Sequence, residues 1–207
     1  MIPVQPRPEY LEFDIQVRQR GQRFLKQNPN PTSAEFRRHN YWKEALENLR
    51  EVYDSACAYT TMKLVAKGSV DHFRPKSKYP QLAYEWSNYR LARQTINTRK
   101  GDTDEVLDPF TIQKGWFTLD LPSYLIKPGQ ELSRDMRVAV NVTINILGLN
   151  NNDNLVQERC RWLVDLADER ITLDFLDRQY KFLALEVTRQ GVQTSLHEIF
   201  SRPPLPV

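Results

Sequence analysis

The stretch VDHFRPKSKYPQLAYEWSNYRLARQTINTRKGD, residues 70–102, combines acidic, basic, amide and imidazole side chains in one short segment. It places an acid, Asp71, beside His72, one of only three histidines in the chain, and follows them with lysines, arginines and two asparagines. A glycine and two prolines interrupt any helical pattern here, so we expect a β-hairpin or a tight irregular loop around Lys67–Ser77. A short helix should follow, beginning within Ser87–Ala92 or after Asn97.

Helical patterns flank this segment on both sides. Thr32 and Glu35 have the spacing of a reciprocal capping box at a helix start. Apolar residues at helical spacing predict helices over Ala34–Tyr59, Ser133–Leu147, Asn154–Ala167 and Asp174–Ile199. Gly148 is a plausible helix stop. FDIQV, residues 13–17, reads as a short extended piece, and Thr103–Gly129 as loops and short strands.

These patterns predict an α+β fold: a mostly helical domain with a small β-containing unit in its middle. The chain of 207 residues has the length of one ordinary domain. We divide it into an N-terminal extended segment and helix (1–56), a central unit (57–110) and a C-terminal helical region (111–207), within one compact domain.

Charge is spread unevenly along the chain. Residues 63–102 hold nine Lys and Arg against three Asp and Glu, whereas the whole chain has a net charge of only +3. A cationic surface attracts polyanions such as nucleic acids, although a solvated basic face is the commoner explanation of such a cluster. Two cysteines give no disulfide framework, and neither a secretory signal nor a bilayer-spanning run is recognisable, so we expect a cytoplasmic protein without membrane contact.

Five side chains in or near this basic block could together cleave a phosphodiester. They are Asp71, His72, Asn88, Asn97 and Lys100, and each taken alone would be an ordinary residue of a surface loop. Histidine, with an unperturbed pKa of about 6.5, can take a proton from water near neutral pH. Carboxylate and amide oxygens are hard ligands suited to Mg²⁺ or Mn²⁺, which stabilises a leaving oxygen as a Lewis acid.

The order of these residues resembles the HNH endonucleases, which are built on a ββα-metal motif. The segment is similar to a branch of that family with the signature DHF-P-KS…LAY-W-N…N–KGD followed by VLDPF. That branch includes nuclease subunits of anti-phage systems such as Septu and some retrons. The similarity is dense over Cys57–Phe110 and looser over the flanking helices. Asp108, in VLDPF, is expected to brace the unit.

The resemblance implies a role for each of the five residues. His72 matches the general base that activates water, and Asp71 matches the first metal ligand. Asn88 matches the asparagine that braces the hairpin loop and orients the base. Asn97 matches the last motif position, on the helix, where it completes the site for Mg²⁺ or Mn²⁺. Lys100, one turn further on, is placed to face the same phosphate. The residues expected to bind nucleic acid are Arg74, Lys76, Lys78, Arg93, Arg99 and Lys100.

The chain departs from many HNH proteins at the positions of a structural zinc. The first Cys-x-x-Cys pair falls at Cys57 and Thr60, and the second at Arg93 and Ile96. Because three of four ligands are absent, we expect no structural zinc. Buried apolar side chains can replace its contribution to stability, and the candidates are Tyr79, Tyr84, Trp86 and Tyr89, with Ile96.

The sequence therefore favours a metal-dependent HNH endonuclease that hydrolyses DNA, with a role in anti-phage defence. The main alternative is a catalytically inactive subunit that binds nucleic acid or docks on an ATPase. An RNase is a third possibility, since this chemistry does not need or exclude a 2′-hydroxyl. The chain has no Walker-type phosphate loop, so the ATPase partner that the resemblance implies would be a separate chain.

Overall fold

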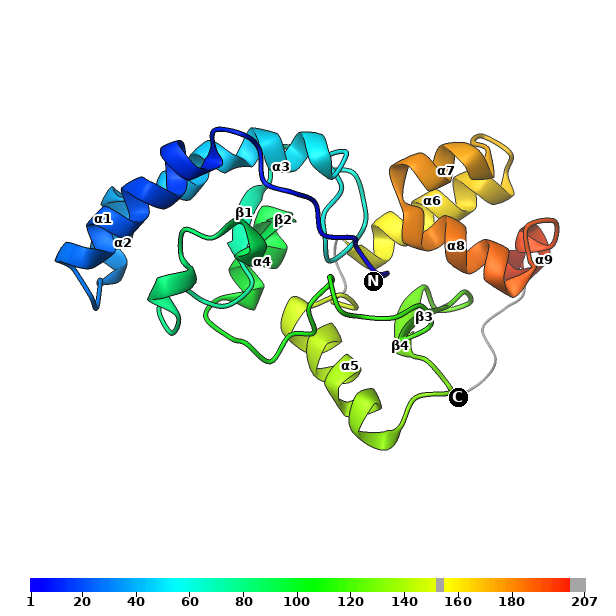
Figure 1. The fold of residues 1–207 in the computed structure, drawn as a ribbon. Helices are drawn as coiled ribbons and strands as arrows, with labels where there is room; N and C mark the ends of the chain where they lie inside the picture. The colour runs from blue at the N-terminus through cyan, green and yellow to red at the C-terminus, as the bar shows by residue number, and fades with distance from the viewer. Residues whose placement is uncertain (152–154, 202–207) are drawn as a thin grey trace.

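The computed structural model describes residues 1–151 and 155–201, and it combines helices with two small antiparallel sheets, as the α+β prediction requires (Figure 1). The strands are β1 (Ser69–His72), β2 (Tyr89–Ala92), β3 (Phe117–Asp120) and β4 (Leu125–Pro128). The α-helices are α1 (Gln19–Gln27), α2 (Ser33–Arg38), α3 (Leu46–Val52), α4 (Gln94–Lys100), α5 (Arg134–Leu147), α6 (Gln157–Ala167), α7 (Leu173–Gln179), α8 (Lys181–Gln190) and α9 (Leu196–Ser201). Short helical turns are η1 (Asp14–Arg18), η2 (Tyr41–Ala45), η3 (Pro80–Leu82) and η4 (Trp86–Asn88).

In the central segment two strands are followed directly by a helix. β1 pairs antiparallel with β2, with His72 opposite Tyr89 and Asp71 opposite Arg90. Helix α4 begins at Gln94, so both expected starting points for the short helix were wrong. The reason is that Tyr89–Ala92 forms strand β2, which pairs with β1. The helix can therefore begin only after Arg93.

The N-terminal helical region is more broken than the apolar spacing predicts. The capping box of Thr32 and Glu35 is present, but the expected helix Ala34–Tyr59 is divided into α2, η2 and α3, with the break at His39 and Asn40. FDIQV is helical rather than extended, because Phe13 and Val17, four residues apart, are both fully buried on one side of a turn.

The C-terminal half follows the sequence prediction where caps are strong. Ser133 caps α5, and Gly148 ends it in the left-handed conformation (φ 61°), as expected. Short strands β3 and β4 lie within the expected loop region. The predicted helix Asp174–Ile199 is instead split into α7, α8 and α9, with a break at the buried Tyr180, which also forms a bridge to Met62. Asn154, the expected start of another helix, lies outside the described residues.

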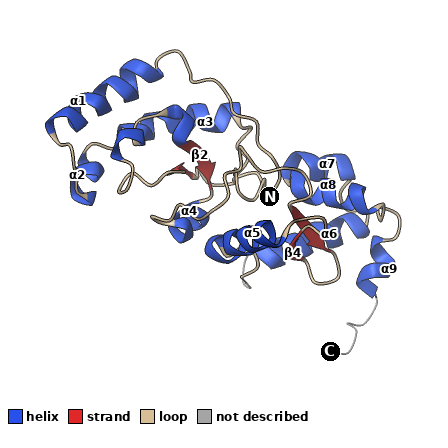
Figure 2. Cartoon of the chain, turned by 60° about the horizontal axis from the view of Figure 1, so that its bottom comes forward, coloured by secondary structure: helices blue, strands red, loops and turns tan. Residues whose placement is uncertain are grey.

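Two hydrophobic cores lie on either side of the β1–β2–α4 unit, and Figures 1 and 2 show the corresponding two lobes of the chain. Val70, Tyr89 and Leu91 of the strands belong to the N-terminal core. Ala92 and Ile96 belong to the C-terminal core. The unit is therefore buried from both sides by segments that are distant in sequence.

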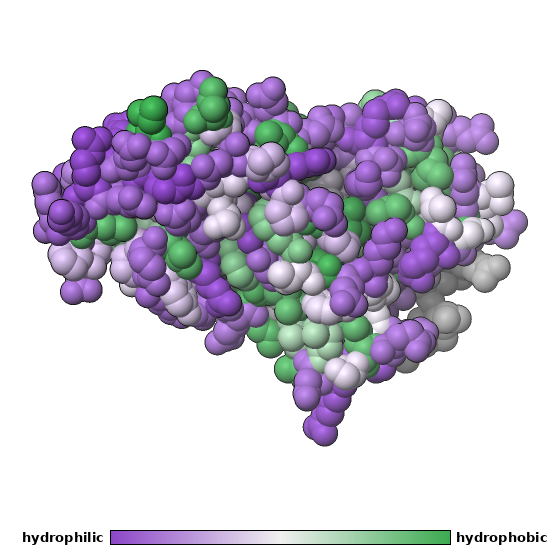
Figure 3. Space-filling view, viewed as in Figure 1, coloured by the Kyte–Doolittle hydropathy of each residue, from purple (hydrophilic) through white to green (hydrophobic). Residues whose placement is uncertain are grey.

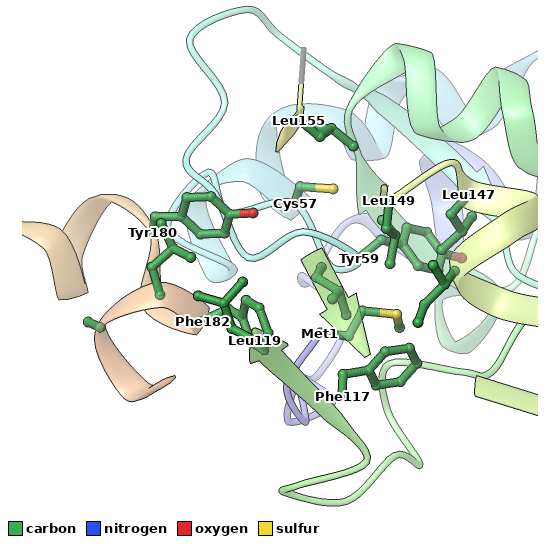
Figure 4. Packing of buried hydrophobic residues seen from close by; sticks show 14 of the residues in the cluster. Met1, Cys57, Tyr59, Phe117, Leu119, Leu147, Leu149, Leu155, Tyr180 and Phe182 are labelled. Atoms are coloured by element: carbon green, nitrogen blue, oxygen red, sulfur yellow. The ribbon is translucent and has the colours of Figure 1, made fainter. Parts of the chain in front are cut away.

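Two of the positions compared with zinc ligands lie within the C-terminal core. Cys57 and Ile96 are both fully buried there, and the backbone N–H of Arg93 donates to the Cys57 sulfur at 3.4 Å. Figure 4 shows Cys57 surrounded by residues such as Leu155 and Tyr180. The expected aromatic substitutes are placed differently, because Tyr84, Trp86 and Tyr89 pack in the N-terminal core and Tyr79 is only half-buried.

A buried ion pair fastens the segment after α4 to the sheet. Arg90 donates to both carboxylate oxygens of Asp108, at 2.8 and 2.7 Å, and its guanidinium lies 3.5 Å from the centre of the Phe110 ring. Asp108 thus braces the unit as expected.

Among the described residues, no helix combines the length and apolar character needed to cross a bilayer.

Gly21 offers a test of how the N-terminal helices pack on the central segment. A Cβ at this position would lie 2.0 Å from the buried Tyr84 ring. Helix propensity alone predicts that Gly21→Ala stabilises the protein by about 1 kcal/mol. We expect the opposite, a loss of roughly 1–3 kcal/mol from overpacking, measured by urea unfolding. Gln22→Ala, at an exposed neighbour in α1, is the control; a more stable Gly21→Ala protein would contradict this packing.

Candidate active site

A cavity of about 490 Å³ brings the main candidate residues together. Asp71 and His72 line it from β1, and Asn97 lines it from α4. Trp42 from η2 and Lys76 from the loop after β1 complete its walls. Three of the five candidate residues therefore line one hollow, with an additional wall from the N-terminal helices, while Asn88 and Lys100 are not part of its lining.

The imidazole of His72 is held in one orientation and one tautomer. Its Nε2 lies 2.9 Å from the carbonyl oxygen of Ala83. Since a carbonyl can only accept, Nε2 carries the hydrogen and Nδ1 keeps its lone pair. The rings of Trp42 and Tyr89 meet the imidazole edge-on, with centroids 4.9 and 5.3 Å away. No donor in the described part of the chain approaches Nδ1, so that atom remains available as a base.

His72 is largely enclosed by its neighbours. The residue is only 6% exposed. Burial, aided by the nearby Lys76 charge, lowers the pKa of His72 to about 3. The imidazole is consequently neutral at physiological pH, as a general base must be, but a pKa this far below neutrality makes it a weak proton acceptor.

Asp71 is bound on both of its oxygens. Lys100 donates to Oδ1 at 3.1 Å and also to the carbonyl of His72 at 2.9 Å, while the Tyr59 hydroxyl donates to Oδ2. The side chains of Lys100 and Asp71 are 0% and 2% exposed, so this is a buried ion pair. Burial raises the pKa of Tyr59 well above its ordinary value, which keeps the hydroxyl protonated as a donor.

The two asparagines have separate tasks. Asn88 accepts from the backbone N–H of Arg74 and donates to the carbonyls of Arg74 and Leu82, so it ties together the loop between β1 and β2. Asn97 donates through Nδ2 to the Ser69 hydroxyl at 2.9 Å and to the Val70 carbonyl at 3.3 Å. These contacts leave the amide oxygen of Asn97 without a donor among the described residues.

Asp71 and Asn97 are the residues that would hold a divalent cation at this site, although Lys100 already neutralises the Asp71 carboxylate. Asp71 and Asn97 supply hard oxygens to one cavity, and a carboxylate oxygen that accepts one hydrogen bond still has a lone pair for another partner. The described ranges contain no cluster of three or more His, Cys, Asp or Glu suited to a metal. Mg²⁺ is commonly held by one or two carboxylates, with waters and substrate phosphate completing its shell.

The residues expected to bind nucleic acid divide into two groups. Lys76 lines the cavity, and Arg74 and Lys78 lie beside Asp104 with their side chains about half-exposed. The other three have partners within the protein. Arg93 pairs with Glu158, Arg99 donates to the carbonyls of Leu147 and Gly148, and Lys100 is buried against Asp71.

Sequence reasoning missed four residues at or beside the site: Trp42, Lys43, Tyr59 and Asp102. Trp42 and Lys43 belong to a helical pattern that reads as ordinary core and surface. Tyr59 lies twelve positions before the carboxylate it contacts, across an irregular loop. Asp102 alone carried a signal, since it ends the KGD motif that contributed to the resemblance.

Comparison with known proteins gives one informative match. The chain is 30% identical over 114 residues to the Septu protein PtuB of Bacillus thuringiensis. The matched region covers 54% of this chain and 43% of that protein, so the chain spans less than half of its relative. No protein-family model matches the chain.

The buried ion pair of Asp71 and Lys100 predicts how mutations change the free energy of unfolding when no metal is bound. Lys100→Met leaves the Asp71 carboxylate buried without its cation, which should cost about 3–5 kcal/mol. Asp71→Asn combined with Lys100→Met removes both charges and should recover much of that loss. Urea unfolding in EDTA of the two single variants and the double variant measures the coupling. Strictly additive losses would contradict the pairing.

Proposed function

We propose that the chain is a metal-dependent endonuclease of the HNH type that hydrolyses DNA phosphodiester bonds. The observation that carries this proposal is the His72 imidazole, whose Nε2–H is fixed on the Ala83 carbonyl while Nδ1 lies free in a cavity shared with Asp71 and Asn97. The succession β1–β2–α4, with these residues on β1 and α4, supports assignment of the segment to a ββα-metal unit.

In this proposal the protein's own residues position and deprotonate water. His72 accepts the proton at Nδ1, and positioned base catalysis of this kind contributes roughly 10²–10⁴-fold in rate. Asn88 holds the loop that carries the Ala83 carbonyl through its bond to Leu82. Asp71 and Asn97 would hold the Mg²⁺ or Mn²⁺, which supplies charge stabilisation for the phosphate and its leaving oxygen. Lys76 offers a cation to the phosphate from the cavity wall.

The match to a Septu protein supports a role in anti-phage defence. By the same resemblance, we propose an ATPase partner subunit that controls when the site acts. DNA is the preferred substrate in this reading, and RNA is the comparison substrate in the assays below.

A second candidate function is a nuclease-like subunit that binds nucleic acid or the ATPase without cutting. The occupied carboxylate of Asp71 favours it, because both oxygens already have buried hydrogen-bond partners. Metal binding distinguishes the two candidates. For the endonuclease, Mn²⁺ should bind near Asp71, measured by calorimetry or electron paramagnetic resonance, and Asp71→Ala should abolish that binding. Unaltered Mn²⁺ binding in Asp71→Ala would exclude Asp71 as a ligand.

The direct test of the proposed base is His72→Ala. We expect cleavage of plasmid and labelled DNA in Mg²⁺ or Mn²⁺ to fall by roughly 10²–10⁴-fold, with EDTA abolishing the activity of the parent protein. His197→Ala, in α9, is the matched control, and labelled RNA is run in parallel. Circular dichroism verifies that both variants fold. Cleavage by His72→Ala at the parental rate would falsify the assignment.

A further inference from the structure

The N-terminal helices carry a second concentration of positive charge. Residues 18–43, here called the basic arm, contain seven Lys and Arg but only one acid, Glu35. Arg18 is neutralised by Glu9, Asp14 and Glu85. The remaining cations are all exposed, and none forms an ion pair within residues 1–151 and 155–201: Arg20, Arg23, Lys26, Arg37, Arg38 and Lys43. The arm is therefore a surface of uncompensated positive charge.

Part of this charge surrounds a defined hollow. A depression of about 290 Å³ is lined by Arg20 and Arg23 of α1 and by His39 and Tyr41 beyond α2. Arg20 donates to the Gln16 carbonyl, and its guanidinium lies 4.2 Å from the centre of the Tyr41 ring. Arg23 donates to the Gln19 carbonyl. Backbone contacts thus hold both arginines in place without using their charge.

Consecutive residues of η2 line the hollow and the candidate active site. Tyr41 lines the hollow, and the next two residues of η2, Trp42 and Lys43, line the active-site cavity. Figure 1 shows α1 and α2 extending outward beside the β1–β2–α4 unit, and the surface over them is largely hydrophilic in Figure 3. Lys67 and Lys76 continue the positive lining on the cavity side.

We propose that the basic arm binds the phosphate backbone of DNA that flanks the cleaved bond, with Arg20 and Arg23 as its main contacts. This inference rests on the proposed function, since it places the substrate on a path that ends at His72. Arginine suits the task because its planar guanidinium binds phosphate in bidentate fashion. An acidic protein partner would also be attracted, but we argue for DNA because consecutive residues of η2 line the hollow and the active-site cavity.

The test uses the full chain with Arg20→Gln and Arg23→Gln combined. Binding of fluorescent duplex DNA is followed by anisotropy in EDTA, where nothing is cut, across a range of KCl concentrations. Each lost phosphate contact reduces the slope of log affinity against log salt by about 0.9, so the double variant should lose about 2. A duplex of about 30 base pairs should show this loss.

Lys114→Gln combined with Arg134→Gln is the matched control, because it removes the same charge from exposed residues in the other half of the chain. Equal melting temperatures show that no variant has unfolded. Equal salt slopes for the arm and control variants would overturn the inference. Because binding is read without cleavage, failure of His72→Ala to stop cutting would refute the proposed function separately.

Discussion

The buried ion pair between Asp71 and Lys100 determines how the central unit is assembled. Neither charge can be left alone in a site that solvent barely reaches, because an unpaired buried charge costs several kcal/mol. Lys100 also donates to the His72 carbonyl, so the last turn of α4 is tied to the end of β1 by two contacts. The position of the imidazole relative to Asn97 follows from this connection, since Asn97 lies one turn earlier on the same helix.

The local parts of this arrangement could be predicted from sequence. Two examples are the capping box at Thr32 and the helix end at Gly148. Both depend on neighbours within a few positions, and the structure has both as expected. The α+β class also follows from local patterns. The grouping of Asp71, His72 and Asn97 in one cavity was expected from the resemblance, because such motifs encode a hairpin and helix in one short stretch.

The rest depends on contacts between distant segments. The helix breaks at His39 and Tyr180 arise where the chain bends to pack, and no strong local signal marks them. Tyr59 and Trp42 reach the site from outside the motif. The charge of the basic arm was hidden because eight Asp and Glu nearly cancel nine Lys and Arg when residues 1–62 are counted together. Lys100 shows the reverse error: its sequence neighbours suggested a surface cation, whereas packing buries it.

Tyr59 has a further consequence for the design of smaller versions of this protein. Its ring is part of the C-terminal core (Figure 4), while its hydroxyl supports the Asp71 carboxylate. The opposite side of the unit depends equally on Trp42 and the N-terminal core. A fragment cut to the motif boundaries would lose both supports and expose apolar strand and helix surfaces to water. The β1–β2–α4 unit therefore depends on both cores for its burial.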